Sequence, residues 1–180
     1  MSVQHTALFV LALAAPCFAD VFTFSGNFAP LDAQFDAYID TFVLTSTADV
    51  TIQSFGYAAG GFDPIVSLFR GSGPSAEFVD LNDDEDPGVV LDSYLTLSGL
   101  VADTYTIAIT YASNAPNAYY WGGGTLGDGF NGLGWDVTGR SDYFRVDVST
   151  SIPEPATLLL LGTTAFLLVS KSWRRVRRLL

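Results

Sequence analysis

The sequence predicts an all-β fold, an antiparallel β-sandwich of jelly-roll type with an N-terminal signal helix and a C-terminal transmembrane helix. Two observations predict the sandwich: apolar and polar residues alternate with a period of two, and glycine- and proline-rich stretches separate the alternating segments. A third observation, an apolar segment near each end of the chain, predicts the two terminal helices. About seven to nine short strands are expected.

Residues 104–111 form the clearest predicted strand. Tyr105, Ile107, Ile109 and Tyr111 fall on one face, and threonines and an alanine fall on the other. Shorter alternating segments are found at residues 22–24, 42–44, 50–52, 94–97 and 144–148. The predicted turns between strands include Gly60-Gly61, Gly71-Ser72-Gly73-Pro74, Asp86-Pro87-Gly88 and the glycine-rich residues 122–139.

Charge is divided unevenly along the 180 residues. Residues 20–152 hold 18 acidic residues and three arginines, a net charge of −15, whereas residues 153–180 have a net charge of +4. A body this acidic repels nucleic acid and anionic lipid, because it has few cations to displace phosphate counterions. The sequence therefore predicts no nucleic-acid partner.

Residues 1–19 have the layout of a secretory signal. An apolar run at residues 7–15 precedes Pro16 and the small residues Cys17 and Ala19, which predicts cleavage after Ala19. Lipidation of Cys17 and a retained anchor are the alternatives. Cleavage removes the only cysteine and the only histidine, so the exported chain has no disulfide.

The C-terminal segment combines three features: Pro153, Glu154 and Pro155, an apolar run at residues 156–169, and a basic tail. The tail consists of Lys171, Arg174, Arg175, Arg177 and Arg178, with Trp173 among them. A helix of 14 residues spans only ~21 Å of a hydrocarbon layer roughly 30 Å thick, but interfacial Trp and snorkelling cations lengthen its effective span. The positive-inside bias keeps the tail cytoplasmic and residues 20–152 outside.

This arrangement resembles the PEP-CTERM sorting signal. The resemblance implies recognition by an exosortase-type membrane transpeptidase, a transient stay in the inner membrane, and a final place in the cell envelope, at the surface or in the extracellular matrix. It also implies a link to exopolysaccharide or biofilm. The alternative is a plain single-pass anchor. The predicted organisation is a signal peptide at 1–19, a β-sandwich ectodomain at 20–150 and a sorting signal at 151–180.

Four short motifs occur in order along the body: Gly61-Phe62-Asp63-Pro64, Asn82-Asp83-Asp84, Asp92-Ser93-Tyr94-Leu95 and Asp128-Gly129-Phe130. With the strand that begins at Asp103, they resemble the bacterial pre-peptidase C-terminal domain, and more closely a PEP-CTERM-associated relative of it. The resemblance implies a calcium-stabilised β-sandwich with no catalytic activity. The chain departs from the family at Asp103, where the family's turn has glycine.

An acidic stretch is the candidate metal site. Its predicted ligands for Ca²⁺ are Asp80, Asn82, Asp83, Asp84, Asp86 and Asp92. Oxygen ligands at every second residue, without a nearby cation, suit a hard ion. Asp63 is a further candidate because of the order of the family motifs. The alternative is a solvated acidic hairpin loop, which the Asp-Pro-Gly turn also favours.

The exported body is predicted not to be an enzyme. Residues 20–152 contain no His, Cys or Lys, which excludes Ser-His-Asp and Cys-His catalysis and leaves only a carboxylate pair of the glycosidase kind. Tyr119, Tyr120 and Trp121 precede a glycine-rich loop, and two interpretations of them stay open. The favoured one is that they fill the end of the core, and the other is a platform for sugar rings.

The predicted function is that of an exported, non-enzymatic cell-surface or matrix protein, sorted through its C-terminal signal. The alternative is a calcium-dependent carbohydrate-binding or adhesion module of the exopolysaccharide matrix.

Overall fold

The computed structural model describes residues 20–28, 35–133 and 139–151, which belong to one compact unit. The predicted signal peptide at 1–19, the Pro-Glu-Pro motif, the apolar run and the basic tail lie outside the described residues. None of the helices in the described ranges has the length and apolar composition needed to cross a membrane.

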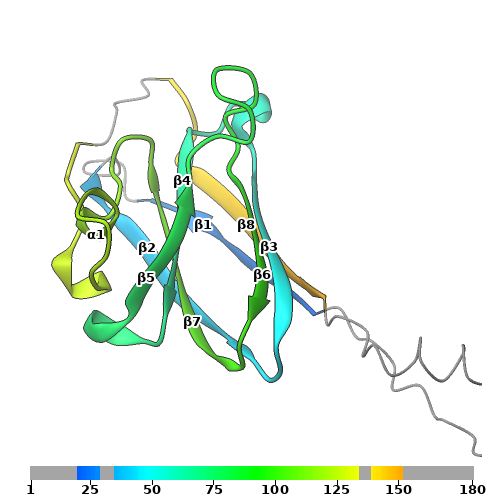
Figure 1. Cartoon of the computed structure of the whole chain (residues 1–180). Coiled ribbons are helices and arrows are strands. Elements are labelled where there is room, and N and C mark those ends of the chain that lie inside the picture. The colour runs from blue at the N-terminus through cyan, green and yellow to red at the C-terminus, as the bar shows by residue number, and fades with distance from the viewer. Residues whose placement is uncertain (1–19, 29–34, 134–138, 152–180) are drawn as a thin grey trace, which may run out of the picture. The chain divides into compact units, whose positions relative to one another are not determined.

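Eight strands in the described ranges form two four-stranded sheets, in which every pair is antiparallel (Figure 1). The first sheet consists, in spatial order, of β1 (Val21–Asn27), β8 (Tyr143–Ser151), β3 (Ala48–Phe55) and β6 (Tyr94–Leu100). The second consists of β2 (Ala37–Leu44), β7 (Asp103–Tyr111), β4 (Pro64–Arg70) and β5 (Glu77–Asn82). The prediction of an all-β sandwich is confirmed at this level.

Helical structure in the described ranges is short. The elements are η2 (Tyr57–Ala59), η3 (Gly73–Ser75), α1 (Asn117–Tyr120) and η4 (Leu126–Asp128). Helix α1 lies beside β5, on the side away from the first sheet (Figure 1).

The main core lies between the two sheets. Strand β8 shows how the sequence builds it: Phe144, Val146 and Val148 are buried, while Arg145 between them is exposed. Side chains of a strand point alternately to its two faces, so this pattern places one face on the core and the other in solvent. Opposite β8, Ile107 and Ile109 of β7 are fully buried in the same cluster.

Strand β7 differs from β8 because both of its faces are buried. Thr106, Ala108 and Thr110 are at most 1% exposed although they point away from the main core. A smaller cluster of Phe69, Ala76 and Ala108 lies on this outer side, with Phe78, Leu126 and Phe130 packed against it. The loop segment that contains η4 therefore covers the outer face of the second sheet around β4 and β7, whereas Ile39 and Val43 of β2 remain exposed.

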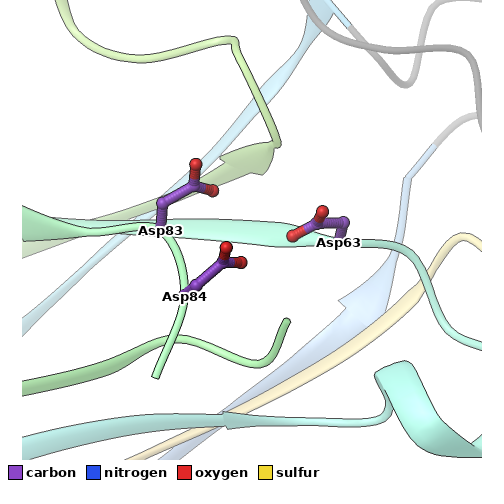
Figure 2. A group of neighbouring side chains, drawn as sticks. All are labelled: Asp63, Asp83 and Asp84. Carbon is purple, nitrogen blue, oxygen red and sulfur yellow. The ribbon is translucent and has the colours of Figure 1, made fainter. Parts of the chain in front are cut away.

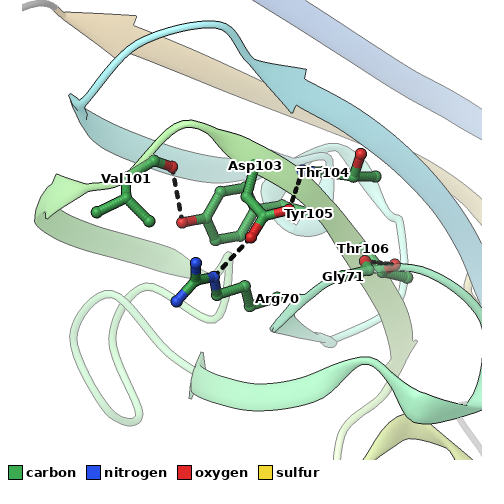
Figure 3. A network of polar contacts seen from close by, with 7 residues as sticks. All are labelled: Arg70, Gly71, Val101, Asp103, Thr104, Tyr105 and Thr106. Atoms are coloured by element: carbon green, nitrogen blue, oxygen red, sulfur yellow. Dashed lines mark hydrogen bonds and ion pairs between the residues drawn. The ribbon is translucent and has the colours of Figure 1, made fainter.

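The turn between β6 and β7 is closed by polar contacts (Figure 3). The Tyr105 hydroxyl donates to Val101 O over 3.0 Å, the arrangement of a tyrosine corner. Asp103 accepts from its neighbour Thr104 N at 2.8 Å and from Arg70 Nε at 2.7 Å. Asp103 stands where the resembled family has glycine, and its φ is not positive, so this turn does not require glycine there.

Strand β8 also fixes where the described body begins and ends. It lies between β1 and β3, with seven registered pairs on each side. Asp20 N donates to Thr150 Oγ1 at 3.1 Å, and Thr150 N donates to Asp20 O at 2.9 Å. The first described residue is therefore tied to the last strand.

Candidate metal site

The β4–β5 hairpin brings three aspartates together. Val66 of β4 pairs with Asn82 of β5, so the residues just before β4 and just after β5 lie at the same end of the hairpin. Asp63 precedes β4, and Asp83 and Asp84 follow β5. One carboxylate oxygen of each lies within 4.8 Å of the others, and Figure 2 shows the three side chains converging from the two segments.

A buried serine holds these two segments next to each other. Ser93 is fully buried, and its Oγ lies 2.6 Å from Pro64 O and 2.9 Å from Asp83 O. A hydroxyl has one proton to donate, so the two carbonyls share it. Ser93 N in turn donates to Ser54 Oγ of β3 at 2.7 Å, which connects this end of the hairpin to the first sheet.

The carboxylates raise one another's pKa values. Burial, followed by the charges of Asp83 and Asp84, raises the pKa of Asp63 from 3.8 to about 7, and the charge of Asp92 acts in the same direction. Desolvation by the neighbouring chain, followed by the charge of Asp84, raises the pKa of Asp83 from 3.8 to about 6, although the side chain as a whole is exposed. Like charges this close cannot all ionise without cost unless a cation joins them.

Two oxygens of the cluster are unsatisfied. Asp63 Oδ1 and Asp84 Oδ1 are buried and have no hydrogen-bond partner in the described part of the chain. A buried polar atom without a partner costs about 1–3 kcal/mol, and more when it is charged. These atoms are therefore free to bind a ligand that offers positive charge.

Arg140 acts on this cluster through its positive charge, which lowers the pKa of Asp63. It does not pair with the aspartates directly in the described contacts. Its guanidinium donates to the carbonyl oxygens of Gly61 and Tyr57 and lies 3.7 Å from the centre of the Tyr57 ring. Arg140 thus holds the loop that leads into Asp63.

The six sequence-predicted ligands separate into two sets. Asp83 and Asp84 lie in the cluster. Asp80, Asp86 and Asp92 lie outside the group that shares the 4.8 Å limit, and Asn82 is the last residue of β5. Two of these four are used within the fold, because Asn82 Oδ1 accepts from Tyr94 N and Asp92 Oδ1 accepts from Ser54 Oγ.

Asp80 and Asp86 have local surroundings. Asp80 Oδ1 accepts from the backbone N of the next residue, Leu81, on the exposed side of β5. Asp86 begins the predicted Asp-Pro-Gly turn, in which Val89 N and Val90 N both donate to Asp86 O. Asp86 and Val90 form an isolated antiparallel bridge across this turn, and Asp63 lies in the cluster with Asp83 and Asp84.

The donor set fits a hard cation. Three carboxylates supply up to six oxygens, and Ca²⁺ takes six to eight oxygen ligands at 2.3–2.6 Å. Backbone carbonyls and water can complete such a shell. His and Cys, the ligands that zinc prefers, do not occur in residues 20–152.

Tyr119, Tyr120 and Trp121 are exposed by 49%, 58% and 66%, so the prediction that they fill the end of the core is wrong. The buried residue of α1 is Ala118, which has a small side chain. The Tyr120 hydroxyl accepts from Asn131 Nδ2 at 2.9 Å. The three rings therefore remain available to a ligand.

Comparison with known proteins gives no relative: no protein-family model, curated protein or solved structure matches this chain.

Proposed function

We propose that this chain is an exported, non-enzymatic surface or matrix protein, sorted by an exosortase-type transpeptidase and built on a calcium-stabilised β-sandwich. The observation that carries the sorting proposal is the order of Pro153-Glu154-Pro155, an apolar run and an arginine-rich tail. Proline has no amide proton and favours extended backbone for itself and for the residue before it, a form that a processing enzyme can bind as a strand.

We also propose that the sandwich is a jelly roll. The strand order β1-β8-β3-β6 against β2-β7-β4-β5 supports it, because successive strands change sheet at every connection except β4–β5. Interlocked Greek keys of eight strands have this alternation. Such a fold presents its loops at the two ends of the strands, and the aspartate cluster occupies one of these ends.

Calcium is proposed as a structural ion held by Asp63, Asp83 and Asp84. The support is the pair of unpartnered buried oxygens, Asp63 Oδ1 and Asp84 Oδ1, within a group of three negative charges. When bound, the ion would neutralise the carboxylates. The residues themselves join the start of β4 to the loop after β5, so ion binding favours the folded state by mass action.

The calcium proposal is tested by thermal unfolding of the full chain in a polyoxyethylene detergent. At a Ca²⁺ concentration 100 times Kd, binding stabilises the fold by about 2.7 kcal/mol, which raises the Tm by about 8 °C relative to EDTA. The double variant Asp83→Asn with Asp84→Asn should lose this rise, whereas Asp80→Asn should keep it. An unchanged Tm of the parent at millimolar Ca²⁺ would remove the proposal.

The sorting proposal is tested in a host that has the transpeptidase. Replacement of Pro153 and Glu154 by alanine should leave the full-length chain unprocessed in the membrane fraction, as seen by its mass on immunoblots. Asp80→Asn is a control outside the sorting signal, and it should be processed. Normal processing of the double variant contradicts the proposal.

A carbohydrate-binding module is the second candidate function. The exposure of Tyr119, Tyr120 and Trp121 favours it, because apolar ring faces exposed on a loop can stack on the faces of pyranose rings. A glycan array run with and without Ca²⁺ tests it, with Trp121→Ala as the variant. Binding that is lost in this variant would favour the carbohydrate-binding function.

A further inference from the structure

The two sheets differ in what their outer faces carry. Loop residues cover part of the outer face of the second sheet, whereas the outer face of the first sheet consists of exposed or half-buried strand residues. Most of these are short polar side chains: Thr23, Ser25, Asp49, Thr51, Gln53, Thr96, Ser98, Asp147 and Ser149. This polar sheet face runs the width of β1, β8, β3 and β6.

Three aromatic residues interrupt the polar sheet face along a diagonal. Tyr94 of β6 pairs with Gln53 of β3, and Phe55 lies two residues further along β3, on the same face. Phe55 pairs with Arg145 of β8, and Tyr143 lies two residues before it. Strand spacing and rise then place successive aromatic Cα atoms about 8 Å apart, about 16 Å in all.

Each of these rings is exposed to a similar extent. Phe55 is 41% exposed, Tyr94 39% and Tyr143 44%, so each residue is partly packed against the fold and partly in solvent. Ordinary packing does not require large rings on a face that lacks an apolar partner. Their alignment across three strands gives a ligand several ring faces at once.

Of the three charged groups of the polar sheet face, Arg145 and Asp147 pair with each other, and Asp49 accepts a hydrogen bond from Gly99 N. Arg145 Nη2 donates to Asp147 Oδ2 at 2.7 Å, and Thr23 Oγ1 donates to Asp147 Oδ1 at 2.7 Å. The Arg145 guanidinium also lies 5.5 Å from the centre of the Phe55 ring. The face therefore has little net charge, in a body whose net charge is −15.

We propose that the polar sheet face binds a neutral polysaccharide chain, laid along the diagonal of Tyr94, Phe55 and Tyr143. Apolar ring faces stack on the C–H faces of pyranoses, and Gln53, Arg145 and Asp147 offer planar donors and acceptors to sugar hydroxyls. The excess of acidic residues repels polyanionic glycans, which selects for neutral ones. This inference gives the carbohydrate-binding candidate a second surface, separate from α1 and independent of calcium.

Affinity electrophoresis of the full chain tests the inference. The protein runs in a polyoxyethylene detergent, which has no sugar headgroup, through gels that contain a mixed-linkage β-glucan, a galactomannan, a dextran or alginate. At least one neutral polymer should retard the parent chain, and alginate should not. Phe55→Ala and Tyr94→Ala should each weaken that binding about tenfold, while Phe55→Trp should retain it.

Trp121→Ala distinguishes the diagonal from the aromatic residues at α1, because it removes an exposed ring outside the polar sheet face. Its binding should equal that of the parent if the diagonal is the binding site. If only Trp121→Ala abolishes binding, the sugar site is at α1 and this inference fails while the second candidate function stands. If no neutral polymer retards the parent, or if Phe55→Ala and Tyr94→Ala bind normally, the inference is also wrong.

Two further measurements keep the outcome clear. Circular dichroism melting should show that the variants fold, and Gln53→Ala replaces Phe55→Ala if that variant unfolds. Light scattering distinguishes a contact between copies: a dimer that dissociates on substitution of Phe55 or Tyr94 would show that this face binds a second copy of the chain, which overturns the inference.

Discussion

The substitution Asp63→Asn should change the stability of the calcium-free protein and its response to calcium in opposite directions. Asn has almost the same shape as Asp but carries no charge, and the Asp63 Oδ1 atom that it replaces has no partner in the described contacts. In the calcium-free protein the charge of Asp63 is unfavourable, because the carboxyl is partly buried beside Asp83 and Asp84. Asp63→Asn should therefore stabilise the calcium-free protein and remove its response to calcium.

The magnitude follows from the pKa. A carboxyl whose pKa rises from 3.8 to about 7 disfavours its charged form by at most ~4 kcal/mol. Asp63 is only partly buried, and solvent screening reduces this value. We expect the Asn variant to be more stable than the parent by about 2 kcal/mol at pH 8 in EDTA.

The sign of the pH dependence is fixed by the same shift. Between about pH 4 and pH 7 the folded state binds more protons at Asp63 than the unfolded state does, so the free energy of unfolding falls as the pH rises. The raised pKa of Asp83, about 6, acts in the same direction. In EDTA the parent should lose stability from pH 5 to pH 8, and Asp63→Asn should lose less.

Urea unfolding of the full chain, followed by circular dichroism, measures both effects at pH 5 and pH 8, in EDTA and in Ca²⁺. Asp80→Asn is the control, because it removes a nearby charge that is exposed and outside the cluster. The reasoning is refuted if Asp63→Asn is less stable than the parent at pH 8 in EDTA, or if calcium stabilises both proteins equally.

Three substitutions test the fold. Tyr105→Phe removes the hydrogen bond to Val101 O and should lower the free energy of unfolding by about 1 kcal/mol in urea titrations; no change would show that the tyrosine corner is dispensable. Ile52→Ala, at a fully buried position of β3, should cost about 3 kcal/mol in the same titration, and a cost below about 1 kcal/mol would contradict its place in the core. Asp103→Asn breaks an exposed ion pair with Arg70 and should leave the urea midpoint unchanged; a large shift would refute the weakness assigned to that pair.

The sheets could be predicted from alternation alone. The pattern at residues 144–148 places each side chain of β8 on the correct face, since one face of that strand is solvated. The burial of Thr106 and Thr110 could not be predicted in this way. A residue on the outer face is buried only because a distant loop packs over it, and strand periodicity contains no information about that loop.

The aspartate cluster could be predicted only in part, because strand periodicity ends where the strand ends. Alternate spacing through Asn82 and Asp84 suggests ligands on one side of an extended strand. Strand β5 ends at Asn82, however, and the chain then turns, so Asp83 and Asp84 both reach Asp63. Tyr94 N donates to Asn82 Oδ1, and Ser54 Oγ donates to Asp92 Oδ1. These contacts depend on how the chain folds, and they leave no signal in composition or spacing.

The exposure of Tyr119, Tyr120 and Trp121 is a further feature that the sequence did not predict. Tyr119, Tyr120 and Trp121 are consecutive, and a single turn of helix points consecutive side chains in different directions. The buried side is taken by Ala118, so the large rings face outward. Local sequence favours core positions for aromatic residues in general but does not specify which side of a short helix meets the sheet.

The place of β8 between β1 and β3 has a mechanical consequence. A force applied at Ser151 along the axis of β8 loads two ladders of seven pairs each in shear. In this shear geometry the ladders must yield together instead of opening one bond at a time. Rupture under such a force is then governed by the rate at which the sheet unfolds and not by its equilibrium stability.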